Sequence, residues 1–149
     1  MKLQNRLTRR LAYSAIVLGV AALTGPGSAL AAPETAAQYQ AVLANPARTD
    51  ADRKDDAKRK PEQFLAFAEV RPGMKVLDVA AGGGSTSELL ALAVGDGGEV
   101  WAQGTKPSAS MAKRLSEHPQ ANLHPVIATF DDPVPAGTPP LDLDRKSVV

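Results

Sequence analysis

The stretch VLDVAAGGGSTSELL, residues 76–90, joins a short apolar strand to a helix through a run of three glycines. The apolar residues around Asp78 predict a buried strand. The glycines at 82–84 predict a loop, since glycine adopts positive φ and lets a ligand approach the backbone closely. Ser85 and Glu88 have the spacing of a capping box, so we expect the helix to begin at Ser85. An acid between a buried strand and such a loop indicates a ligand site.

Strand and helix patterns continue on both sides of this stretch. Pro61 suits a first helical turn, and the helix after it is expected to pack through Phe64, Leu65, Phe67, Ala68 and Val70. The elements after the stretch are strand, helix, strand and the start of a strand, at residues 99–104, 107–117, 123–130 and 141–143. Alternating strands and helices imply right-handed crossovers. We therefore expect an α/β fold, a Rossmann-like parallel sheet sandwiched by helices, incomplete, with three strands and the start of a fourth.

Residues 1–31 have the composition of a secretory signal peptide. MKLQNRLTRR carries four basic residues and no acid, LAYSAIVLGVAAL is apolar, and Ala29 and Ala31 give the small-x-small cleavage pattern. The alternative is an uncleaved membrane anchor, for which the apolar run is short, because a span needs about 20 residues. We expect cleavage after Ala31, a periplasmic or secreted product, and no stable membrane span afterwards.

The remaining composition excludes several kinds of function. The leader contains four of the 17 Lys and Arg residues, so the rest has 13 basic and 16 acidic residues and a net charge of −3. This balance does not predict a nucleic-acid partner. The chain has no cysteine, which excludes disulfides and thiolate metal sites. No metal site is predicted, since the two histidines do not have a metal-binding spacing.

Two further segments flank the predicted domain at 61–143. Residues 32–60 form a lead-in: a helix with Tyr39, Val42 and Leu43 as its apolar contacts, then the charged run RTDADRKDDAKRK. This run predicts a solvated, salt-bridged helix or linker; the alternative is a lid over a ligand at the glycine loop. Residues 144–149, DRKSVV, abandon the strand pattern, and we expect a non-native tail, with the true protein continuing past Leu143; the alternative is a real, short polar tail.

Asp78 bears on which ligand the loop receives. A phosphate-binding loop needs a lysine after its last glycine, but Ser85 and Thr86 follow here. The dinucleotide fingerprint would need a glycine where Ser87 stands. A carboxylate beside the loop repels a pyrophosphate and favours a cation such as a ligand ammonium. The alternative role for Asp78 is to cap the turn by holding the loop amides, and the two roles can coexist.

VLDVAAGGG resembles motif I of the class I S-adenosylmethionine-dependent methyltransferases, in which an apolar strand ends in an acid followed by spaced glycines. Asp78, Ala80, Gly82 and Gly84 take the motif positions, and Gly83 lies within the loop. The resemblance runs from residue 61 to residue 143. It implies S-adenosylmethionine as cofactor, with the acid and the loop holding its amino acid part. Ala80 stands where the family has its first glycine.

The resemblance implies further contacts at the ends of the later strands. The family binds the ribose hydroxyls with an acid after the second strand, where this chain has Gln103 or Gly104. Asp131 and Asp132 follow the third strand and match the region that contacts adenine; the alternative is a helix cap or turn pair. Asp142 matches the aspartate that often opens the fourth strand. No catalytic residue is identified.

The resemblance leads to one main functional hypothesis: S-adenosylmethionine-dependent methyl transfer to an unknown acceptor. The alternative is a non-catalytic module that binds an adenosyl ligand or a partner, which export and the missing ribose acid favour. A nicotinamide-dependent oxidoreductase is disfavoured by Asp78 and Ser87.

Overall fold

The computed structural model describes residues 33–146, so the predicted signal peptide lies outside the described residues, as do residues 147–149. Four strands form one sheet: β1 (Lys75–Val79), β2 (Glu99–Gly104), β3 (Leu123–Ile127) and β4 (Leu143–Lys146). Their order is β3-β2-β1-β4, and every neighbouring pair is parallel. This confirms the predicted Rossmann-like α/β fold with a parallel sheet and flanking helices.

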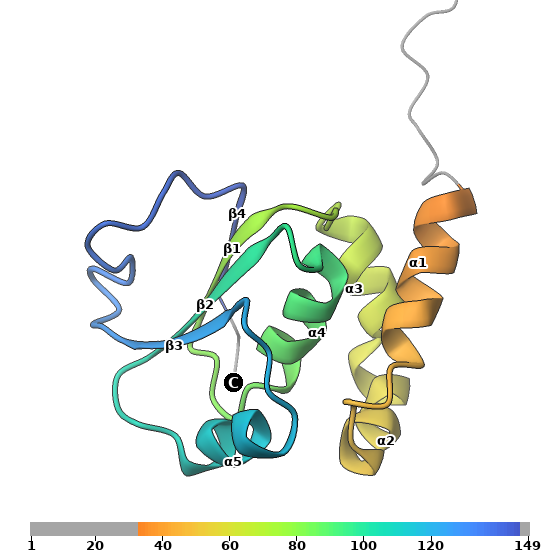
Figure 1. Ribbon diagram of the computed structural model, residues 1–149, viewed down its shortest axis with the longest axis horizontal. Helices are drawn as coiled ribbons and strands as arrows, with labels where there is room; N and C mark the ends of the chain where they lie inside the picture. Colours follow the sequence, from red (N-terminus) through yellow and green to blue (C-terminus); the bar gives the residue numbers. More distant parts are fainter. Residues whose placement is uncertain (1–32, 147–149) are drawn as a thin grey trace, which may run out of the picture.

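Within residues 33–146, five helices lie to one side of the sheet and beyond one end of its strands (Figure 1). They are α1 (Pro33–Leu43), α2 (Asp50–Arg59), α3 (Pro61–Phe67), α4 (Ser85–Val94) and α5 (Ala109–Glu117). α4 packs directly on the sheet. α1 packs on the side of α4 that faces away from the sheet, and α3 packs against α1. α5 lies near the ends of the strands, beside the glycine loop. The carboxyl ends of β1 and β2 are thus bordered by α4 and α5.

The core lies between the sheet and α4. β1 and β2 contribute Val76, Val100 and Ala102, and α4 contributes Leu90 and Val94. β1 is buried on both faces, as expected for an inner strand of a parallel sheet. This packing accounts for the apolar composition of β1 after Lys75, which Asp78 alone interrupts.

The predicted lead-in helix is α1, and it is part of the core. Tyr39 is 1% exposed, and its hydroxyl donates a hydrogen bond to the Val70 carbonyl at 2.8 Å. Val42 is also buried, and Leu43 packs against the core. Gln38 Nε2 donates to the Ala93 carbonyl of α4 at 3.2 Å. The sequence prediction of apolar contacts at residues 39, 42 and 43 is therefore confirmed.

α4 begins at Ser85, as predicted, but its cap differs from the prediction. The N-cap is Gly84, with φ of 85°, and no side chain caps this end of the helix. The Glu88 amide donates to the Gly84 carbonyl, while the Glu88 side chain pairs with Arg114. The predicted capping box at Ser85 is therefore wrong. A capping box forms instead at Thr49, whose side chain and backbone both exchange hydrogen bonds with Asp52 at the start of α2.

Two other predictions need correction. Phe67 does not pack: it ends α3 and is 91% exposed, because the chain turns there toward the buried Val70. The fourth strand does not include residues 141 and 142 but begins at Leu143. Asp142 instead pairs with the start of β1, as its side chain accepts from the Lys75 amide at 2.8 Å. The non-native tail at residues 144–149 stays a prediction; residues 144–146 of it lie in β4.

Over residues 33–146, no helix has both the length and the apolar character needed to cross a membrane.

Candidate functional site

The glycine loop leaves the carboxyl end of β1 through a series of left-handed residues. Ala80, Gly82 and Gly84 have φ of 60°, 58° and 85°. The Gly84 amide donates to the Ala81 carbonyl at 3.0 Å, which closes the loop into a tight turn. Ala80 adopts this conformation without being glycine, which costs about 1–2 kcal/mol for an L-residue. The turn therefore needs positive φ at the motif position where Ala80 replaces the first glycine.

Gly84 also allows α5 to lie close to the loop. A Cβ at Gly84 would lie 2.4 Å from Met111 Sδ and 2.7 Å from Met111 Cε. A Cβ at Gly83 would lie 3.5 Å from the Cβ of Ser110, an ordinary contact. Close approach therefore favours glycine at position 84 more strongly than at position 83.

Gln103 ties the loop to the ends of β2 and β3. It is fully buried. Its Oε1 accepts from the Ala80 amide at 3.0 Å, and its Nε2 donates to the Ala128 carbonyl at 2.6 Å. Its backbone carbonyl accepts from the Ala81 amide. Both ends of this amide thus hold backbone groups, and the contact with ribose hydroxyls stays a prediction.

Asp78 lies beneath the loop, with a side chain that is completely buried. Its Oδ2 accepts from Ser87 Oγ at 2.7 Å, and its Oδ1 accepts from Arg145 Nη1 at 3.0 Å. The Arg145 guanidinium also lies 4.7 Å from the centre of the Phe64 ring. The carboxylate thus links β1, α4 and β4, and its contact with a ligand ammonium stays a prediction.

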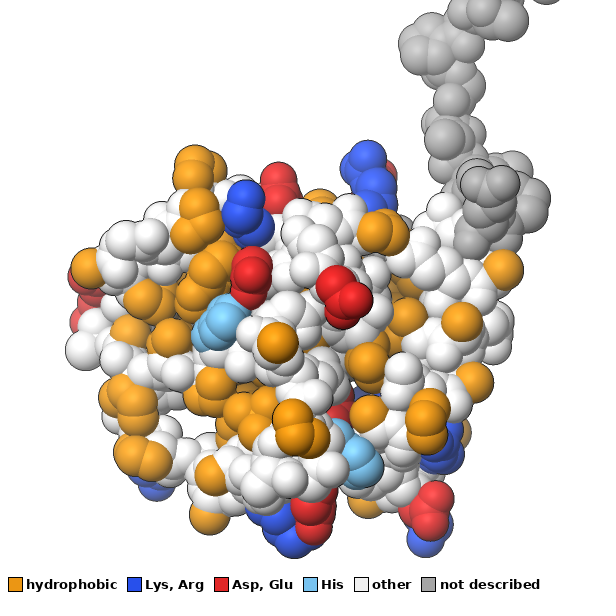
Figure 2. All heavy atoms as spheres, viewed as in Figure 1, with side chains coloured by type: hydrophobic (Ala, Val, Ile, Leu, Met, Phe, Trp, Pro, Cys, Tyr) orange, Lys and Arg blue, Asp and Glu red, His pale blue; other side chains and the backbone are white. Residues whose placement is uncertain are grey.

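An apolar cavity of about 470 Å³ opens on one side of the loop. Its walls come from the loop, the ends of β2 and β3, and α5, and they include Ala80, Gly82, Gln103, Met111, Ile127 and Phe130. In Figure 2 a hollow lies below β3, and hydrophobic side chains gather over β3 and the segment after it. The exposed hydrophobic residues Ile127, Phe130 and Val134 belong to this region. A flat, weakly polar ligand group would match this cavity.

A second cavity, of about 440 Å³, lies on the other side of the loop and is more polar. Thr49 and Arg59, from the two ends of α2, line it together with the loop, the start of α4, and α5. Arg59 donates to Ser85 Oγ at 3.3 Å, and it forms an ion pair at 3.7 Å with Asp55, four residues earlier on α2. The charged run is thus a helix whose two ends form part of the cavity wall.

Asp131 and Asp132 are exposed, and the apolar cavity is lined by the preceding Phe130 rather than by either of them. The Asp132 amide donates to Thr129 Oγ1 at 3.2 Å, as in a turn. Their proposed contact with adenine stays a prediction. Phe130 was not among the predicted site residues, although an aromatic residue just past the end of a parallel strand is a signal in the sequence. Among residues 33–146, no cluster of His, Asp and Glu is arranged to hold a metal.

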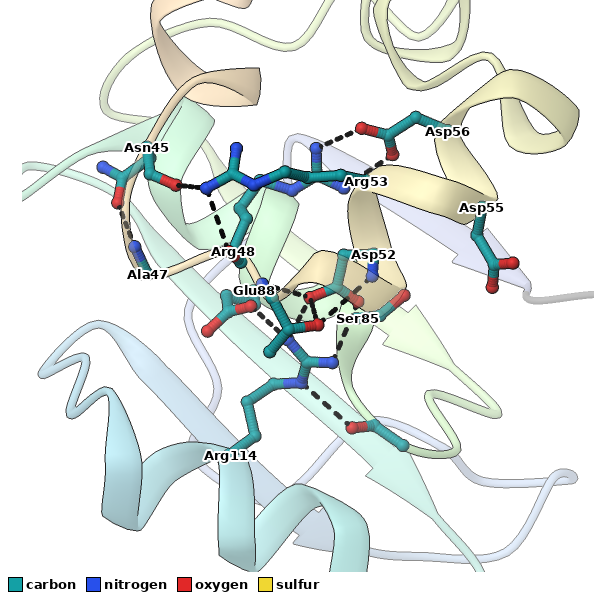
Figure 3. A network of polar contacts seen from close by, with 12 residues as sticks. Asn45, Ala47, Arg48, Asp52, Arg53, Asp55, Asp56, Ser85, Glu88 and Arg114 are labelled. Carbon is teal, nitrogen blue, oxygen red and sulfur yellow. Dashed lines mark hydrogen bonds and ion pairs between the residues drawn. The ribbon is translucent and has the colours of Figure 1, made fainter.

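Arg114 of α5 connects the loop with α2 and α4 (Figure 3). Its two terminal nitrogens donate to both oxygens of Asp52, at 2.8 and 3.0 Å. It also pairs with Glu88, and its Nε donates to the Gly83 carbonyl at 3.4 Å. Its side chain is 13% exposed, and those of Asp52 and Glu88 are 5% and 1% exposed. Sequence reasoning missed this cluster.

The two carboxylates of this cluster have opposite pKa shifts. Burial raises the pKa of Asp52, but hydrogen bonds from Arg114 and Thr49 outweigh burial and bring the pKa down to about 2. Burial also raises the pKa of Glu88, and Arg114 offsets only part of this effect. One oxygen of Glu88, Oε1, is buried without a hydrogen-bond partner. Arg114 therefore stabilises the charged form of Asp52 more fully than that of Glu88.

No protein-family model matches the chain. Over 37 residues, 25% of its length, the chain is 57% identical to the "Ubiquinone/menaquinone biosynthesis C-methyltransferase UbiE" of Paraburkholderia phytofirmans and to the protein of that name from Burkholderia cenocepacia. It spans 15% of the length of these curated relatives. Its structure is similar to that of a protein-L-isoaspartate O-methyltransferase, with a TM-score of 0.54 and 20% identity, over 59% of this chain and 28% of that one.

The sheet order, the glycine loop at the end of β1 and these similarities agree with one another. The chain thus has a Rossmann-like methyltransferase fold, similar to that of the protein-L-isoaspartate O-methyltransferase, and over 37 residues its sequence is similar to that of C-methyltransferases.

Proposed function

We propose that this chain binds S-adenosylmethionine at the glycine loop and is part of an enzyme that transfers the methyl group to an acceptor. The observation that carries the proposal is the loop itself. Three left-handed residues at the carboxyl end of β1 shape a loop whose backbone lines two cavities. In open α/β sheets, ligands bind at this end of the strands. The sequence similarity to C-methyltransferases over 37 residues supports methyl transfer.

The residues around the loop suit the chemistry of this cofactor. The apolar cavity, with Phe130 at its mouth, matches the adenosyl group, and its size lies within the range of about 300–1,000 Å³ typical of ligand pockets. The polar cavity, bordered by Arg59 and the start of α4, matches the charged amino acid part. A bound cofactor supplies an activated methyl group, and the protein's task is to position it against the acceptor. The residues that we expect to hold the cofactor are Asp78, Ala80, Gly82, Gly83, Gly84, Gln103, Asp131 and Asp132.

The direct test is isothermal titration calorimetry of the purified chain with S-adenosylmethionine, with NAD as the comparison ligand. We expect saturable binding of S-adenosylmethionine and none of NAD. Asp78→Asn keeps the shape of the side chain but removes its charge, and a loss of affinity would support its predicted role. Tight binding of NAD, with no binding of S-adenosylmethionine, would reject the proposal.

A non-catalytic binding module is the second candidate. One observation favours it: the amide of Gln103, at the position of the family's ribose acid, already holds the Ala80 amide and the Ala128 carbonyl. The two candidates differ in turnover. Labelled S-adenosylmethionine incubated with the chain and an extract of envelope material should label an acceptor if the chain is catalytic. Cofactor binding without any labelling would favour the binding module.

We also propose that the protein is exported to the periplasm or secreted, on the basis of the leader pattern at residues 1–31. Mass spectrometry of the protein from its host should find a new amino terminus after Ala31. An intact leader on protein recovered from the cytosol would reject export and would leave the cofactor proposal unaffected.

A further inference from the structure

The Arg114 cluster lies where three elements meet at the glycine loop. Asp52 comes from α2, Glu88 from α4 and Arg114 from α5, and all three side chains are largely buried. Figure 3 shows the guanidinium reaching both carboxylates. Asp52 is held in addition by the Thr49 hydroxyl and the Thr49 amide, at 2.7 and 2.9 Å. One guanidinium is therefore shared by both carboxylates, and Asp52 is held by Thr49 as well.

The cluster also contacts the loop. Arg114 Nε donates to the Gly83 carbonyl, and a Cβ at Gly84 would lie 3.6 Å from Arg114 Cδ. A carbonyl held on one side of a peptide unit fixes the direction of the neighbouring amide on the other side, because the peptide bond is planar. The Gly84 amide, the next along the chain, closes the loop on the Ala81 carbonyl. Arg114 therefore acts on the peptide unit that shapes the loop.

The same guanidinium determines where α2 lies. Asp52 is near the start of α2, and Arg59 at its end donates to Ser85 Oγ. Both ends of α2 also line the polar cavity. The Asp52–Arg114 contact is the more buried of these two attachments, since the side chain of Arg59 is 57% exposed. Loss of Arg114 would leave α2 attached to the loop region mainly through an exposed residue.

We propose that Arg114 is a positioning residue for the cofactor site: it holds the Gly83 carbonyl, Asp52 and Glu88 together, so that the glycine loop keeps its shape and α2 stays closed against it. This inference rests on the proposed function for the identity of the ligand. The shape of the loop is a property of the chain itself and can be measured without the ligand.

The experiment compares Arg114→Met with Arg48→Met. Arg48 is the matched control, because it is also buried and makes two hydrogen bonds of 2.7 Å to one carboxylate, that of Asp56, within the lead-in segment. Each variant of the full chain is measured by amide hydrogen exchange over residues 80–86, by urea unfolding and by titration with S-adenosylmethionine. We expect both variants to lose stability, but only Arg114→Met to exchange faster in the loop and to bind the cofactor roughly tenfold more weakly or worse.

Arg114→Lys separates charge from geometry. One ammonium keeps the positive charge, but it lacks the fork that spans two carboxylates and a carbonyl. We expect this variant to recover part of the stability while the loop still exchanges quickly and affinity stays low. If Arg114→Met fails to fold, Arg114→Lys replaces it in the comparison with Arg48→Met.

Each outcome has a defined meaning. Equal loop exchange in the Arg114 and Arg48 variants would overturn the inference, and so would unchanged cofactor affinity despite faster exchange. Faster loop exchange in the Arg114 variant, together with wild-type protein that binds no S-adenosylmethionine, would confirm the effect on the loop and reject the proposed function. The two failures are thus distinguishable.

Discussion

Ala80 is a residue whose backbone conformation suits glycine better. Its φ of 60° is left-handed, and its amide is held by Gln103 Oε1. Ala80→Gly removes a strain of about 1–2 kcal/mol but adds freedom to the unfolded chain worth about 0.4–1 kcal/mol. We therefore predict that this variant is more stable by about 0.5–1 kcal/mol, measured as a higher urea midpoint with an unchanged m-value. A loss of stability would show that the Ala80 methyl group makes a contact worth more than the strain.

Alanine substitutions at Gly84 and Gly98 allow effects on stability to be separated from effects on cofactor affinity. A Cβ at Gly98 would lie 2.6 Å from the Met74 carbonyl oxygen and 2.5 Å from Val94 Cβ, rigid atoms far from the loop. A Cβ at Gly84 would meet the flexible end of Met111, so its cost is mainly the positive φ, about 1–2 kcal/mol. We predict that Gly98→Ala loses more free energy of unfolding, whereas Gly84→Ala loses more affinity for S-adenosylmethionine. If the variant that loses more free energy of unfolding also loses more affinity, the loss of affinity only reflects the loss of stability.

Among the helices and strands, α2 is the element whose attachment to the rest of the chain we expect to weaken at low pH. Asp52 has a pKa of about 2 in the folded chain, against an ordinary value of 3.8. Its contribution to stability is therefore complete above pH 3.8 and is lost as the pH falls toward 2. The shift corresponds to about 2 kcal/mol. We predict that Asp52→Asn abolishes most of this acid-dependent loss, as measured by urea unfolding from pH 5 to pH 2.

Glu88 of α4 should have the opposite effect on how the free energy of unfolding changes with pH. Burial raises its pKa above the ordinary 4.5, so the folded chain binds a proton more readily than the unfolded chain. Stability should rise as the pH falls through the folded pKa of Glu88 toward 4.5, and this gain should be absent in Glu88→Gln. Measurement of the free energy of unfolding between pH 8 and pH 4.5 tests this, with Glu117→Gln as an exposed control. An identical slope in wild type and Glu88→Gln would contradict the assignment.

At the scale of the whole molecule, local sequence patterns predicted the helices and strands. The structure of the candidate site depends instead on contacts between residues far apart in the sequence. The apolar run around Asp78, the glycines and the alternation of strands and helices are local patterns, so the parallel sheet was predictable. The Arg114 cluster was not, because its partners Glu88 and Asp52 lie 26 and 62 residues away in sequence. The same contacts explain the wrong capping box: Arg114 takes the Glu88 side chain that would have reached back to Ser85.

A variant of the lead-in helix α1 can show whether the molecule unfolds in a single cooperative transition. The Tyr39 hydroxyl is its buried polar attachment to the segment that precedes β1, through the Val70 carbonyl. Tyr39→Phe keeps the ring but leaves that carbonyl without this donor, which should cost about 1–2 kcal/mol. If α1 is part of the cooperative core, this loss appears as a shift of a single transition seen by both circular dichroism and tryptophan fluorescence.

The control for this variant is Phe67→Leu, on the neighbouring helix α3, where the side chain is 91% exposed and the change should be nearly neutral. Trp101 of β2 reports on the sheet, and the helices dominate the far-ultraviolet signal, so the two probes follow different parts of the molecule. Two transitions in Tyr39→Phe, with the tryptophan signal unchanged from wild type, would show that α1 unfolds separately. Because α1 packs on α3 and α4 through one shared core, we expect the two signals to shift together.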